Sequence, residues 1–193
     1  MKKALKIFLS IILSMIVFVI SAVWYLYFST TVRNRLGDYE SRTTNFTAYS
    51  DLHPTDVLPK LDDLPEYVDI SYQYRLKRMF LWSAETLRLV VTYDKETYEE
   101  EKKKLEDKNY LDHVVKAEYS DESLNRFLIP EFEFSVNSYN FRILESEDYP
   151  HTIGFIATSD EKNSIAYLYF YDYYLDFIAS MEPFIKDYFR YKW

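Results

Sequence analysis

Cysteine is absent from this chain of 193 residues. Its absence excludes disulfide bonds, thiolate zinc sites, covalent haem attachment and catalysis by a thiol. A lipid anchor attached to cysteine is excluded for the same reason. The fold must therefore be held by its core, and the 20 tyrosines and 14 phenylalanines favour strands and bury large apolar areas.

Glycine and histidine are almost as scarce. Only Gly37 and Gly154 occur, so the chain contains no G-x-G-x-x-G, P-loop or G-x-S-x-G motif. The three histidines, His53, His113 and His151, lie too far apart in sequence for an H-E-x-x-H site. We therefore expect no cofactor and no metal ion. A catalytic triad assembled by the fold is still compatible with the sequence, because triads are defined by geometry.

Charge is missing from Ile7 to Val32, directly after lysines at positions 2, 3 and 6. Within this stretch the apolar segment Ile7 to Phe28 would form a helix about 33 Å long. That length matches a hydrocarbon core of about 30 Å, and aromatic side chains at the end of the segment suit the headgroup region. We predict that residues 1–29 form a transmembrane signal anchor, which makes the chain a single-pass protein of the cell membrane.

A cleaved signal peptide is the competing interpretation of this segment. The only plausible cut follows Ala22, but Ile20 fits a small-x-small cleavage site poorly and the apolar run continues to Phe28. An uncleaved anchor is favoured for these reasons. Three lysines precede the segment, whereas Arg33 and Arg35 follow it, so the positive-inside rule narrowly favours a cytoplasmic N-terminus and an extracytoplasmic C-terminal domain.

Negative charge dominates the rest of the chain and limits its partners. Beyond residue 29 there are 20 basic and 31 acidic residues, a net charge of −11. This charge repels nucleic acid and anionic headgroups, so we expect no nucleic-acid partner, whereas a protein partner is compatible. Ser10 and Ser14 have small-xxx-small spacing and Ser21 lies near the same helix face, which permits a homodimer. Serine is also tolerated in a lipid-facing helix, so the sequence alone does not support one.

The chain divides into three parts. After the anchor, residues 30–66 have the composition of a juxtamembrane stalk or connector, with frequent Ser, Thr, Asn and Asp and three prolines. Several apolar residues within it predict that part of the connector lies against the domain. Residues 67–193 then form one small extracytoplasmic domain.

Period-two patterns dominate this domain. Val68 to Lys77 is predicted as a half-buried strand, and a second strand with Leu87 and Leu89 on its inner face follows a reversal at Ser83–Glu85. A helix that runs to about Lys108 is predicted next. Asp94 can cap it, or alternatively Thr97 with Glu100, which have capping-box spacing.

Further elements are expected after that helix: a short helix at 120–128, a hairpin or bulged strand at 132–143 and a hairpin of strands 152–158 and 165–171. A closing helix should begin at Tyr173. Because hairpins outnumber crossovers, we predict the α+β class: an N-terminal transmembrane helix followed by a small domain with a mainly antiparallel sheet and two principal helices.

Two groups of residues are candidate sites. Glu131 and Glu133 would lie on one strand face about 6.5 to 7 Å apart, a separation used by glycosidase carboxylates, although an ordinary outer sheet face has the same pattern. Tyr167, Tyr169 and Tyr171 would point to one side of a strand and offer a binding surface for sugars or peptides. A tyrosine-rich core face would have the same spacing.

Three functions are compatible with these features. The first is a membrane-anchored protein that displays a small α+β domain for binding or interaction, without catalysis. The second is a membrane-tethered hydrolase that acts on cell-surface material through a carboxylate pair such as Glu131 and Glu133. The third is a small subunit of a larger membrane complex.

Overall fold

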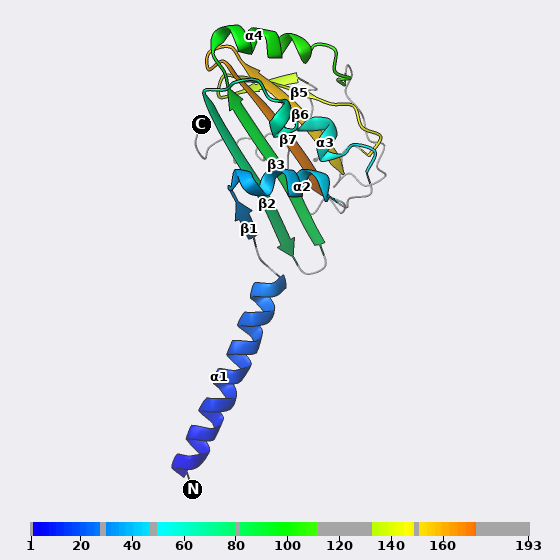
Figure 1. The fold of residues 1–193 in the computed structure, drawn as a ribbon. Coiled ribbons are helices and arrows are strands. Elements are labelled where there is room, and N and C mark those ends of the chain that lie inside the picture. The colour runs from blue at the N-terminus through cyan, green and yellow to red at the C-terminus, as the bar shows by residue number, and fades with distance from the viewer. Residues whose placement is uncertain are drawn as a thin grey trace.

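The computed structural model describes residues 2–27, 30–46, 50–79, 82–111, 133–148 and 151–172 (Figure 1). Its elements in chain order are α1 (Lys2–Tyr27), β1 (Thr30–Arg33), η1 (Leu36–Asp38), α2 (Tyr39–Thr44), α3 (Pro54–Val57), η2 (Leu61–Asp63), β2 (Asp69–Met79), β3 (Trp82–Thr92), α4 (Lys95–Lys104), β4 (Glu133–Val136), β5 (Tyr139–Ile143), β6 (Thr152–Ser159) and β7 (Ser164–Asp172). The helices expected at 120–128 and from Tyr173 lie outside the described residues.

The first helix, α1, stands apart from the rest of the molecule (Figure 1). Its segment Lys6–Tyr25 is long and apolar enough to cross a membrane, and none of it is buried inside the structure. An N-terminal signal sequence has the same length and composition. The helix therefore agrees with a membrane-spanning segment by size and composition.

The seven strands in the described residues form one antiparallel sheet in the order β1-β2-β3-β7-β6-β5-β4. The predicted α+β class with an antiparallel sheet is confirmed. The reversal predicted at Ser83–Glu85 is wrong, because the β2–β3 ladder continues until Met79 lies opposite Trp82. Ser83 and Glu85 are half-buried residues of β3, and their polar side chains suit such positions as well as turns.

One side of the sheet, which we call the tyrosine face, is covered by the segment that follows β1 (Figure 1). Tyr39 from α2 is 1% exposed and packs edge-on against Tyr72 of β2, with ring centroids 5.3 Å apart. Its hydroxyl donates a hydrogen bond to the carbonyl of Pro59. Residues 30–66 thus contribute β1 to the sheet and several side chains to the core on this face.

Gly154 of β6 allows this layer to approach the sheet closely. A Cβ added at this glycine would lie 2.7 Å from Val57 Cγ2 and 3.0 Å from Leu52 Cδ2. Tyr169 of β7 completes the contact, because its hydroxyl donates a buried 3.0 Å hydrogen bond to the Leu52 carbonyl. Because Gly154 has no side chain, the covering segment can pack directly over the central strands.

The other side of the sheet, the opposite face, has its own apolar cluster on β3 to β7, which includes Phe141, Phe155 and Leu168. Its strands connect through tight turns, such as the Asn137-Ser138 turn between β4 and β5, where both residues have positive φ. The helix predicted after Asp94 is present as α4, and the Asp94 carboxylate accepts hydrogen bonds from two backbone N–H groups at its start.

Candidate functional site: a basic groove at the sheet edge

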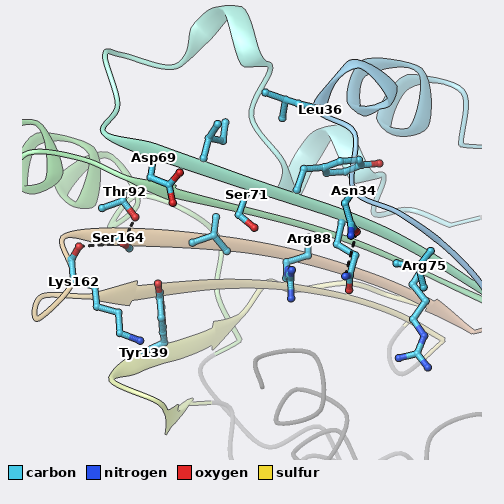
Figure 2. A pocket seen from close by; sticks show the side chains of 15 residues that line it. Asn34, Leu36, Asp69, Ser71, Arg75, Arg88, Thr92, Tyr139, Lys162 and Ser164 are labelled. Carbon is cyan, nitrogen blue, oxygen red and sulfur yellow. Dashed lines mark hydrogen bonds between the residues drawn. The ribbon is translucent and has the colours of Figure 1, made fainter. Parts of the chain in front are cut away.

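A groove of about 1130 Å³ lies where the opposite face meets the β2 edge of the sheet (Figure 2). Five consecutive residues of β2, from Asp69 to Gln73, line it. A pocket on one sheet face would be lined by alternate residues of a strand, since side chains alternate between faces. The groove therefore follows the backbone edge of β2 and continues over the opposite face.

The open edge results from the short length of β1. Its four residues pair with β2 only from Tyr74 to Lys77, whereas β2 begins at Asp69. Beyond β1 the chain leaves the ladder, and Gln73 Nε2 donates a 3.3 Å hydrogen bond to Asn34 Oδ1 at this point. In the described part of the chain, residues 69–73 of β2 thus have a strand neighbour, β3, on one side only.

Three cationic side chains line the groove at different points along its length (Figure 2). Arg75 comes from β2, Arg88 from β3 and Lys162 from the turn before β7. Arg88 is only 3% exposed. The Lys162 ammonium donates a 3.1 Å hydrogen bond to the Asn137 carbonyl and lies 4.9 Å from the centre of the Tyr139 ring.

The groove is basic in a chain that is acidic as a whole. Among the described residues, its lining contains three cations and one carboxylate, that of Asp69, whereas the sequence carries a net charge of −8. Burial raises the pKa of the Tyr139 phenol, and the hydrogen bond with Ser164 offsets only part of this rise. Burial likewise raises the pKa of Tyr72 to about 12. Both phenols are neutral near pH 7, so neither adds negative charge to the groove.

The other polar groups of the lining are hydroxyls, amides and a carboxylate. Hydroxyls of Thr92 and Ser164 bond to each other at 2.7 Å, and Gln73 and Ser71 add an amide and a further hydroxyl. No histidine lines the groove, and Asp69 is its only carboxylate among the described residues. The part of the chain that the structure describes also contains no group of three or more residues able to hold a metal ion. Cations and hydrogen-bonding groups of this kind bind anions.

The structure brings the three predicted tyrosines together but covers them. Tyr167, Tyr169 and Tyr171 lie on the tyrosine face, as the strand spacing predicts. Tyr167 is 5% exposed and Tyr169 is fully buried, and Phe46 packs edge-on against the rings of both Tyr169 and Tyr171. Tyr167 and Tyr169 are therefore buried, whereas Tyr171 is half-buried.

Only one member of the predicted carboxylate pair lies among the described residues. Glu131 lies outside the described residues, whereas Glu133 begins β4 with its backbone opposite Arg142. The hydrolase hypothesis stays a prediction. The serines of the predicted homodimer contact lie on α1: Ser10, Ser14 and Ser21. The homodimer stays a prediction as well.

The basic groove was not predicted from the sequence. Its cations come from three separate segments, and only the sheet register brings them to one face. One local signal exists, because Arg88 interrupts the apolar run Leu87 to Val91 of β3. A buried arginine in such a strand requires polar surroundings on that face.

Comparison with known proteins finds no matching family model, no similar curated protein and no similar solved structure.

Proposed function

We propose that this chain is a single-pass membrane protein whose extracytoplasmic α+β domain binds an anionic partner in the basic groove, without catalysis. The groove itself carries the proposal. It combines Arg75, Arg88 and Lys162 in an otherwise acidic protein. Positive potential confined to one concave surface attracts and orients an anionic ligand, while the acidic remainder disfavours binding elsewhere.

The size and composition of α1 support membrane attachment. An uncharged stretch of this length is favourable in a bilayer, and the exposed Trp24 and Tyr25 side chains near its C-terminal end suit the headgroup region. The lysines before α1 favour a cytoplasmic N-terminus, which directs the groove to the outside. The anchor then keeps the binding domain at the membrane surface.

Reversal of two groove charges tests the binding role. The full-length chain in detergent micelles is titrated with fluorescein-labelled octaglutamate and anisotropy is measured. Arg75→Glu combined with Lys162→Glu should weaken binding by about a hundredfold, since two attractive contacts become repulsive. Both side chains are partly exposed, so folding should persist, and circular dichroism checks this.

Lys95→Glu with Lys103→Glu provides the matched control. Both lysines are exposed on α4, and this pair changes the net charge of the protein by the same amount. The control should bind within about twofold of the native protein. Equal losses in the two double variants would mean that net charge alone governs binding, and absence of binding by the native chain would contradict the proposal outright.

A further inference from the structure

We infer that the ligand of the groove is an extended acidic polypeptide segment that adds to the open edge of β2 as a further strand. This inference rests on the proposed function and names the chemical class of the partner. Three independent features of the described residues support it: the shape of the groove, the chemistry of its edge and the exposed apolar side chains beside it.

The length of the groove fits an extended chain. One end of the groove lies at Asp69, which pairs with Thr92 of β3 and, through it, with Ser164 of β7. The other end lies at Arg75, which pairs with Thr86. The two ends are six positions apart along β2, a distance of about 20 Å.

The three cations are spread along this length. Arg88 lies level with Gln73, two residues from Arg75, whereas Lys162 precedes the Ser164 end. Arg75 and Lys162 are half-buried and lie towards opposite ends of the groove, so a single small anion cannot contact both. An extended polymer with several acidic groups can do so.

The backbone hydrogen-bonding groups at the β2 edge favour a polypeptide over other acidic polymers. Strand β2 presents backbone N–H and C=O groups along residues 69–73, where the described part of the chain supplies no second strand. An added peptide strand completes this ladder with main-chain hydrogen bonds, which is a common mode of peptide recognition. A sugar polymer lacks the regularly spaced amides that the ladder requires.

Apolar side chains mark the same edge. Outside α1, the large hydrophobic residues exposed in the described structure are Val32, Tyr67 and Val68. Val32 lines the groove from β1, and Tyr67 and Val68 directly precede Asp69 at the start of β2. Val68 is 71% exposed. A strand that carries both acidic and apolar residues would bury these side chains and pair with the cations.

Peptide probes test the inference with the full-length chain in lipid nanodiscs. The first probe is an acetylated octapeptide of alternating valine and glutamate. The second has the same sequence with every backbone nitrogen methylated, which keeps the carboxylates but removes the N–H donors. The third is an oligoglucuronate of eight units. The first probe should bind at least about tenfold more tightly than either of the others, because only it completes the ladder.

Equal binding of the native and methylated peptides would overturn strand addition while leaving the anionic groove in place. Equal binding of the oligoglucuronate would assign the groove to an acidic polysaccharide and would also overturn the inference. If none of the three probes binds, the proposed function fails with it.

Substitution at the edge supplies a second readout. Val68→Asp places a like charge beside the incoming strand and removes an exposed apolar contact, so it should weaken the first probe about tenfold. Thr55→Asp, at an exposed position of α3, should leave binding unchanged. Self-association that Val68→Asp abolishes, without any peptide binding, would assign the edge to a second copy of the chain and overturn the inference.

Discussion

The domain is expected to unfold cooperatively when the pH rises past 10, the ordinary pKa of a tyrosine, towards 12. Burial is the largest cause that raises the pKa of the phenols on the tyrosine face: Tyr39, Tyr72, Tyr74, Tyr93, Tyr167 and Tyr169. The folded state therefore holds these protons more tightly than the unfolded chain does. Stability is fully present below pH 10 and is lost as the pH rises through the raised values.

Circular dichroism and tyrosinate absorbance should change together in this transition, since ionisation of a buried phenol requires exposure. Two tyrosines offer a direct test, because the hydroxyls of Tyr72 and Tyr93 are buried without a hydrogen-bond partner in the described structure. Tyr72→Phe combined with Tyr93→Phe removes two ionisable groups at little cost to packing. This variant should unfold at a higher pH than the native protein.

The control for this experiment is Tyr67→Phe, because Tyr67 is 41% exposed. Its alkaline midpoint should match that of the native chain. If the double variant and the control give the same midpoint as the native protein, ionisation of the tyrosine face does not govern alkaline unfolding and the explanation given for it is wrong.

The second large effect is expected in α1. Ile16→Arg combined with Val17→Arg places two guanidinium groups at the centre of the uncharged segment. Each costs about 2.5 to 3.5 kcal/mol at a helix centre on the insertion scale, so the pair costs about 5 to 7 kcal/mol. We expect this variant to move from the membrane fraction to the soluble fraction, measured by fractionation and immunoblotting.

Ala4→Arg with Leu5→Arg adds the same charge beside the N-terminal lysines and should leave the chain in the membrane. Retention of the central double-arginine variant in the membrane would mean that attachment does not depend on α1. Release of both variants would point instead to an effect of charge on synthesis or export.

Local sequence patterns predict much of the sheet. The alternation after Val68 predicts β2, and the paired patterns around a polar reversal predict β6 and β7. Asp94 marks the start of α4 because a carboxylate at that position satisfies free backbone N–H groups. These signals work because each depends on neighbours within a few residues.

Long-range packing explains what the sequence does not predict. The tyrosines of β7 have the pattern of an exposed platform as well as that of a core, and the difference is made by Phe46 and Leu52, more than a hundred positions away. Gly154 likewise gives no local sequence signal, because its role depends on its close approach to Val57. The groove depends on a strand, β1, that ends early, and four residues give too short a pattern to predict that end.

The most direct test of whether α1 permanently holds the domain at the bilayer is to wash membranes with alkaline carbonate. The mass of the intact protein is then measured in the pellet and in the wash. Alkaline pH weakens the domain itself, so retention then depends on α1 alone. The chain should stay in the membrane pellet with residues 2–27 present. A mature chain that begins at Val23 and appears in the wash would contradict it.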